Sequence, residues 1–282
     1  MDKKLSNFEY FVFDLDGTLY TPDKRVSPKT VKTLNDLRAK GKKIVIATGR
    51  PFYRNYELID QLKLTSSMIS SNGSLVYDID NKKVEYIDTI STKTGFEISS
   101  YLEANQINHL VYTSDTMIVA QYSPSEFCNR IVLPFIDKNY KYPFKNIVTH
   151  DFTKMINDFQ IVKYLILLED TNKEKIEKLN KLITKFDDIY GINSQRDVLD
   201  IMPKNASKGH ALAAFIKNHN IDKNKVIAFG DADNDLSMQE AAGYFVAMGN
   251  ANERVKANAN FVTKSNTEDG ISYFVDLLGK NE

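Results

Sequence analysis

The sequence has little of several features that mark whole classes of protein. It holds a single cysteine, Cys128, so an intramolecular disulfide is excluded and a reducing, cytoplasmic location is expected. Basic and acidic residues both number 37, and this zero net charge predicts no binding of nucleic acid or an anionic membrane. No segment has the roughly 20 apolar residues of a membrane span or the apolar centre of a signal peptide. The expected partner is therefore a small molecule, and the oligomeric state stays open.

The chain of 282 residues is longer than a usual domain, which indicates two domains or one core with a large insertion. Short apolar runs alternate with helical patterns at both ends of the chain, near residues 10–13, 43–47, 67–70, 198–202, 225–229, 244–247 and 261–262. This alternation predicts an α/β, doubly wound parallel-sheet (Rossmann-like) core. From residue 75 the pattern becomes a hairpin, which parallel crossover units do not use. We expect the core at residues 1–81 and 193–282, and an inserted α+β domain at residues 82–192.

The first apolar strand breaks into two aspartates in the segment FVFDLDGTLY, residues 11–20. In an extended strand alternate side chains share a face, so Asp14 and Asp16 are expected to lie in one small volume. Like charges that close repel unless a cation lies between them or one is protonated. Gly17 would allow the chain to turn sharply. A strand that ends in a solvated acidic turn explains the same pattern.

Polar clusters follow other core strands as well: Thr48 follows the second, and Asp231 and Asp235 follow a later one. The carboxyl ends of parallel strands form one edge, so these side chains should converge with Asp14 and Asp16. Asp231 and Asp235 are four residues apart, so they either cap the start of a helix or hold a hard cation such as Mg²⁺. None of the four histidines lies beside an acidic cluster, so zinc is not expected.

An anionic substrate also needs positive charge and hydrogen-bond donors. Thr48 and the amide of Gly49, at a strand-to-helix junction, can donate to phosphate oxygens. Lys208 can supply a compact point charge, although a solvent-facing lysine is the ordinary alternative. Arg50 could either clamp the substrate or pair with surface acids. The third strand stops at a further polar group, Ser71-Asn72-Gly73, to which no role is given.

Four segments resemble, in order, the four motifs of the haloacid dehalogenase (HAD) superfamily: FDLDGTL at 13–19, ATGR at 47–50, SKG at 207–209 and GDADND at 230–235. The length and the position of the insertion are similar to those of the Cof-type sugar-phosphate phosphatases. The resemblance spans residues 11–262 and is more specific in the core than in the insertion. It implies a Mg²⁺-dependent phosphatase that hydrolyses small phosphate monoesters through an aspartyl-phosphate intermediate, with the insertion acting as a cap.

The resemblance also implies roles for the acidic residues. Asp14 would be the nucleophile, and Asp16 would protonate the leaving oxygen and then activate water. Asp14, the main-chain carbonyl of Asp16, and Asp231 would hold Mg²⁺, with Asp235 ordering the groups around it. We expect the crowded acidic site to raise the pKa of Asp16 above its reference value of about 3.9, so that it carries a proton.

Among the other motif residues, the resemblance implies that Thr48 and Lys208 bind the transferring phosphoryl group and that Asn234 lies near it. Three positions depart from the family pattern: Asn205 replaces a common glycine, Asp200 a common glutamate and Ser74 a usual alanine. Four tyrosines could stack on a substrate ring, but ordinary packing is the favoured interpretation: Tyr112, Tyr122, Tyr140 and Tyr142.

Two alternative functions use the same fold. One is an intramolecular phosphate transferase of the phosphohexomutase type, which would use the same aspartates. The other is a non-catalytic regulatory or binding protein that has kept the fold. The presence of a candidate residue for every catalytic role argues against this second alternative. The sequence leaves the substrate open among hexose phosphates, nucleotides, flavin phosphates and pyridoxal phosphate.

Overall fold

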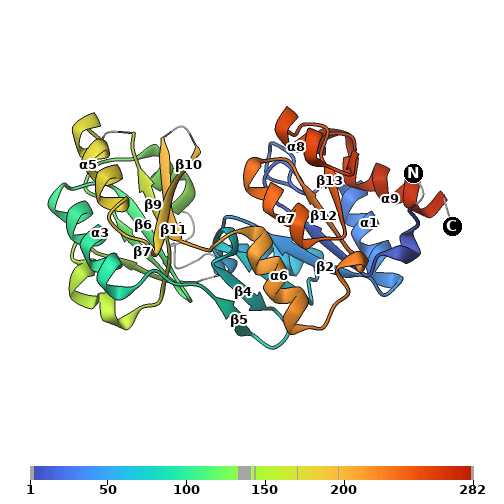
Figure 1. The fold of residues 1–282 in the computed structure, drawn as a ribbon, viewed down its shortest axis with the longest axis horizontal. Helices are drawn as coiled ribbons and strands as arrows, with labels where there is room; N and C mark the ends of the chain where they lie inside the picture. Colours follow the sequence, from blue (N-terminus) through green and yellow to red (C-terminus); the bar gives the residue numbers. More distant parts are fainter. Residues whose placement is uncertain (1–2, 133–140, 143, 170, 196, 281–282) are drawn as a thin grey trace. The chain divides into compact units, whose positions relative to one another are not determined.

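The structure is a computed structural model that describes residues 3–132, 141–142, 144–169, 171–195 and 197–280. It contains two compact units (Figure 1). We call Met1–Tyr86 with Ser207–Glu282 the core domain, and Ile87–Ala206 the inserted domain. Within the described residues, no helix is long and apolar enough to cross a membrane.

The core domain is built on an eight-stranded sheet in the order β14-β13-β12-β1-β2-β3-β4-β5. From β14 to β3 neighbouring strands are parallel, and β3 and β4 are antiparallel. The chain proceeds outwards from β1 in one direction and from β12 in the other, so the strand order reverses between them. The strands are β1 (Tyr10–Phe13), β2 (Lys43–Ala47), β3 (Ser67–Ser70), β4 (Leu75–Asp78), β5 (Lys83–Ile87), β12 (Val226–Gly230), β13 (Tyr244–Ala247) and β14 (Phe261–Val262).

Helices cover both faces of this sheet, as the buried apolar strands require. Apolar residues of α6, α7 and α8 pack with Val12, Val45 and Ala228 on one face. On the other face the ring of Phe229 contacts Phe274 of α9. The helices are α1 (Pro28–Ala39), α2 (Tyr56–Leu62), α6 (Lys208–Asn218), α7 (Leu236–Ala241), α8 (Glu253–Asn258) and α9 (Gly270–Lys280), with 3₁₀ turns η1 (Leu5–Asn7), η2 (Phe52–Asn55), η3 (Ser71–Gly73), η6 (Lys223–Lys225), η7 (Asp233–Asp235) and η8 (Asn266–Glu268). This α/β architecture confirms the predicted fold class.

The inserted domain is a six-stranded sheet in the order β10-β11-β9-β6-β7-β8, with α3 and α5 packed on one face (Figure 1). Its strand pairs are antiparallel except β7 with β8. The strands are β6 (His109–Thr113), β7 (Thr116–Ala120), β8 (Lys145–Val148), β9 (Ile161–Leu167), β10 (Ile189–Gln195) and β11 (Val198–Pro203). The helices among its described residues are α3 (Thr92–Ala104) and α5 (Lys173–Ile183), with the π-helix η4 (Cys128–Val132) and the 3₁₀ helix η5 (Phe152–Asp158).

The domain limits differ from the expected insertion at residues 82–192. Strand β5 belongs to the core sheet, so the first limit moves to residues 86 and 87. The strand expected in the core at residues 198–202 is β11, which pairs with β9 and β10, so the second limit moves to residues 206 and 207. The physical reason is that an apolar run indicates burial but does not identify the partner strand.

Candidate active site

The switch point of the core sheet brings three strand ends together. Asp14 follows β1, Thr48 follows β2 and Asp231 follows β12, and these strands are neighbours in the sheet. The amide of Asp14 extends the ladder by donating to the carbonyl of Phe229, at 3.1 Å. Ligands of open α/β sheets bind at this edge, where the strand order reverses. The motif residues named from the sequence therefore lie at a location suited to a ligand.

Lys208 is the buried cation of this site. It is the first residue of α6, whose start is capped by Ser207. Its side chain is 1% exposed, and Nζ lies 2.5 Å from Asp14 Oδ1 and 2.7 Å from Asp235 Oδ1. Burial alone would lower the pKa of Lys208, but the charges of Asp14 and then Asp235 outweigh it and raise the pKa. The solvent-facing alternative is therefore excluded, and Lys208 is a fixed positive charge.

Asp235 caps the turn that follows β12 and binds Lys208. Its Oδ2 accepts hydrogen bonds from the amides of Asp231, at 2.9 Å, and Ala232, at 3.0 Å. Its Oδ1 accepts from Lys208. Both oxygens of this fully buried carboxylate are thus bonded within the protein. Asp235 orders the loop and the lysine, which leaves Asp14 and Asp231 as the carboxylates that fit a metal.

The acidic cluster fits a hard divalent cation. Asp14, Asp231 and Asp235 each place one carboxylate oxygen within 4.8 Å of the others. Burial raises the pKa of Asp231 to about 6, although the hydrogen bond from Thr18 acts to lower it. Burial also raises the pKa of Asp14. The ammonium group of Lys208 pairs with two of these three carboxylates, those of Asp14 and Asp235, so negative charge is in excess. Oxygen-only donors and excess negative charge suit Mg²⁺.

Asp16 is not part of the cluster of Asp14, Asp231 and Asp235 found among the described residues. Strand β1 ends at Phe13, so the expected alternation stops before Asp16, whose side chain is 41% exposed. Its carboxylate contacts Arg50 Nε at 3.0 Å and Nη2 at 2.7 Å, and Lys24 Nζ at 2.6 Å. Partial burial acts to raise the pKa of Asp16, but Arg50 and then Lys24 outweigh it and lower the pKa. The expected rise of this pKa is therefore wrong, because the nearest charges are cations.

The segment after β2 is held by the segment after β3. Thr48 is buried, and its Oγ1 accepts a hydrogen bond from the amide of Arg50. A Cβ added to Gly49 would lie 2.9 Å from Asn72 Oδ1, so the Asn72 side chain lies directly against Gly49. Asn234 Nδ2 donates to the same oxygen of Asn72, at 3.2 Å. The sequence alone assigns no role to Asn72, although its position in the polar group after the third strand indicates the same edge of the sheet.

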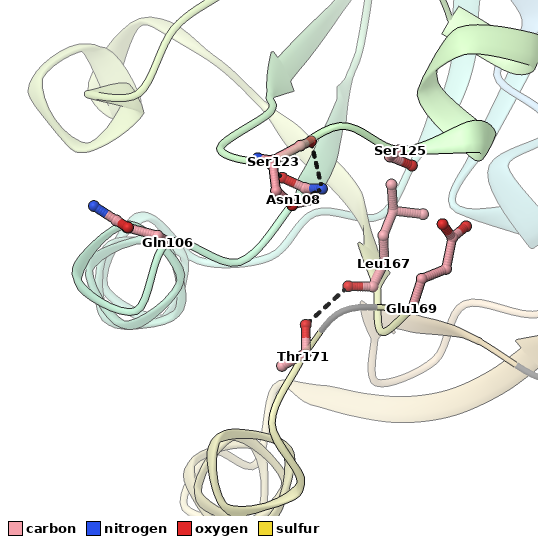
Figure 2. A pocket seen from close by; sticks show the side chains of 7 residues that line it. All are labelled: Gln106, Asn108, Ser123, Ser125, Leu167, Glu169 and Thr171. Atoms are coloured by element: carbon pink, nitrogen blue, oxygen red, sulfur yellow. Dashed lines mark hydrogen bonds between the residues drawn. The ribbon is translucent and has the colours of Figure 1, made fainter.

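A separate pocket lies in the inserted domain, and none of the predicted site residues lines it (Figure 2). Asn108 there donates to Ser123 Oγ, and Thr171 donates to the carbonyl of Leu167, so these polar groups bond to each other. The pocket is lined by Gln106, Asn108, Ser123, Ser125, Leu167, Glu169 and Thr171.

The tyrosines considered for ring stacking have partners within the protein. Tyr112 is buried in β6, the ring of Tyr122 stacks on His150, and Lys141 contacts the ring of Tyr142. Tyr140 lies outside the described residues. Ordinary packing thus accounts for the contacts of the three described tyrosines.

Comparisons with known proteins agree with this geometry. The family model for haloacid dehalogenase-like hydrolases matches residues 11–275. Phosphatase YwpJ of Bacillus subtilis is 30% identical, over 94% of this chain and 98% of that protein. Pyridoxal phosphate phosphatase YbhA of Escherichia coli is 29% identical, over 93% of this chain and 95% of that protein. The solved structure of the HAD subclass IIB sugar phosphatase BT4131 has a TM-score of 0.76 and 25% identity, over 96% of this chain and 99% of that one.

The chain belongs to the haloacid dehalogenase-like hydrolase family. The two curated relatives named above are phosphatases, and the chain is an enzyme of this phosphatase type. The resemblance stated from the four motifs is thereby confirmed.

Proposed function

We propose that the protein hydrolyses small phosphate monoesters with the help of Mg²⁺, through an aspartyl-phosphate intermediate on Asp14. The observation that carries the proposal is the buried ammonium group of Lys208 between Asp14 and Asp235, beside Asp231. A fixed cation next to a carboxylate that has little solvent around it suits phosphoryl transfer, where positioning and charge neutralisation supply most of the catalysis.

In the first step a carboxylate oxygen of Asp14 forms a bond to phosphorus, and the bond from phosphorus to the leaving oxygen breaks. Asp16 gives its proton to that oxygen. Lys208, the Thr48 hydroxyl and the amide of Gly49 would stabilise the charge on the other phosphoryl oxygens. Bound Mg²⁺, held by Asp14, the main-chain carbonyl of Asp16, and Asp231, would neutralise further negative charge.

In the second step a water molecule attacks the phosphorus of the aspartyl phosphate, and the bond to Asp14 breaks. Asp16 accepts a proton from that water, and inorganic phosphate and the alcohol are the products. The ion pairs with Arg50 and Lys24 favour the ionised Asp16 that this step requires. Proton donation in the first step requires those contacts to break.

The substrate class follows from the relatives. Pyridoxal phosphate and sugar phosphates, named for the similar proteins, are both small phosphate monoesters. We propose the same class for this chain, with the inserted domain selecting the substrate within it. A partner other than such a small molecule is not needed for the reaction.

The test is phosphate release from p-nitrophenyl phosphate and from a panel of sugar, nucleotide, flavin and pyridoxal phosphates, with Mg²⁺ and with EDTA. We expect release that EDTA abolishes and Mg²⁺ restores. Conversion of a sugar phosphate to its isomer without free phosphate would support the transferase instead. No release from any compound would contradict the proposal.

A further inference from the structure

The turn that follows β3 has an unusual backbone. Ser71, Asn72 and Gly73 have φ values of 50°, 55° and 94°. Residues other than glycine seldom adopt this left-handed region, and such conformations concentrate at functional sites. A Cβ added to Gly73 would lie 2.0 Å from the carbonyl oxygen of Ser207, so the turn packs against the residue before Lys208.

The backbone of this turn holds the segment that contains Gly49. The amide of Asn72 donates to the carbonyl of Thr48 at 3.0 Å, and the amide of Ser71 donates to the carbonyl of Arg50 at 3.0 Å. These two hydrogen bonds flank Gly49 on both sides. The conformation of the turn therefore sets the position of the Gly49 amide.

The side chain of Asn72 links this segment to the one after β12. Its Oδ1 lies against Gly49 and accepts the hydrogen bond from Asn234 Nδ2. Asn234 is in η7, directly before Asp235, which bonds Lys208. One oxygen atom thus contacts two of the residues assigned to the phosphoryl group.

We propose that Asn72 is a positioning residue, which orients the Asn234 amide and the Gly49 segment for binding the phosphoryl group. The inference rests on the proposed function. Asparagine suits both tasks, because it tolerates the left-handed conformation and offers a neutral acceptor. Glycine would keep the backbone but lose the acceptor, whereas aspartate would keep the acceptor but add negative charge beside an anionic substrate.

The test uses Asn72→Gly, which removes the side chain without straining the backbone. Its matched control is Asn220→Gly, an exposed asparagine after α6 with φ 52°. For Asn72→Gly we expect the KM for p-nitrophenyl phosphate and the inhibition constant of inorganic phosphate to rise together by about fivefold, with kcat changed less than twofold. For Asn220→Gly we expect all three unchanged.

Two further variants separate positioning from a merely structural role. If Asn72 acts through Asn234, the double variant with Asn234→Ala should bind phosphate within twofold of Asn234→Ala alone. Asn72→Asp should bind phosphate more weakly than Asn72→Gly, whereas a structural role would make aspartate equivalent to the wild type.

The inference is overturned if Asn72→Gly keeps wild-type KM and phosphate inhibition, if its effect multiplies fully with that of Asn234→Ala, or if Asn72→Asp binds like the wild type. An active wild-type enzyme with an unaffected Asn72→Gly variant refutes this inference alone. A wild-type protein that releases no phosphate refutes the proposed function and this inference with it.

Discussion

Replacing Lys208 by methionine should remove the only cation that contacts both Asp14 and Asp235 among the described residues. The Nζ to oxygen distances are 2.5 and 2.7 Å, and the ammonium group is almost fully buried. At an effective dielectric constant of about 20, a charge pair near 4 Å contributes about 4 kcal/mol. The desolvation of the charges offsets part of this, so we expect the free energy of unfolding to fall by about 3–5 kcal/mol.

The loss should depend on pH with a definite sign. Without the ammonium group, the pKa of Asp14 in the folded protein rises further above its unfolded value. The folded variant therefore binds a proton that the unfolded chain releases, so its stability falls as pH rises. We expect the difference from the wild type to be larger at pH 8 than at pH 5.5. The double variant with Asp14→Asn should recover at least about 1 kcal/mol at pH 7, because one buried charge is gone.

The assay is urea unfolding in EDTA followed by far-UV circular dichroism, since the chain has no tryptophan for fluorescence. The control is Lys217→Met, an exposed lysine in the last turn of the same helix, which should stay within about 0.5 kcal/mol of the wild type. The reasoning is refuted if Lys208→Met unfolds within about 1 kcal/mol of the wild type, or if the double variant is less stable than the single one.

Three further predictions concern other charged groups. The pKa of Asp231 is raised to about 6 in the folded state, so its contribution to the stability of metal-free protein is lost as pH rises from 4.5 to 7; the Tm of the wild type relative to Asp231→Asn should therefore fall over this window, and a relative Tm that rises would contradict this. Lys163 and Asp200 form a buried ion pair at 2.5 Å, so Lys163→Met should lower the free energy of unfolding in urea by about 3–5 kcal/mol, and adding Asp200→Leu should restore most of that loss. A double variant whose loss is the sum of the two single losses would contradict this prediction. Arg50→Gln should raise the pKa of Asp16 seen by carboxyl ¹³C NMR, and an unchanged pKa would show that the ion pair does not control it.

The sequence was sufficient to predict the fold class and the placement of Asp14, Thr48 and Asp231 at neighbouring strand ends, because parallel strands share one carboxyl edge. The role of Lys208 came from the resemblance of its motif. The sequence did not show where β11 pairs, since the buried run at residues 198–203 would fit either sheet. The residues that contact Asp16 could not be predicted either, because Lys24 and Arg50 approach it from separate loops.

Asn72 shows a different limit. A polar residue at a strand end has many ordinary explanations, and its backbone conformation and its contact with Asn234 come from packing between loops far apart in sequence. The same limit applies in part to Lys208. Its motif indicated a role, but its burial between two carboxylates could be seen only in the folded structure.

The central claim is that Asp14 carries the phosphoryl group, and trapping that intermediate tests it most directly. Enzyme mixed with a ³²P-labelled phosphate ester and Mg²⁺, then quenched in acid within milliseconds, should retain label on the peptide that contains Asp14. The folded Asp14→Asn variant should retain none, and its turnover should fall by more than roughly a thousandfold. Normal turnover by that variant, or label on another residue, would contradict the account.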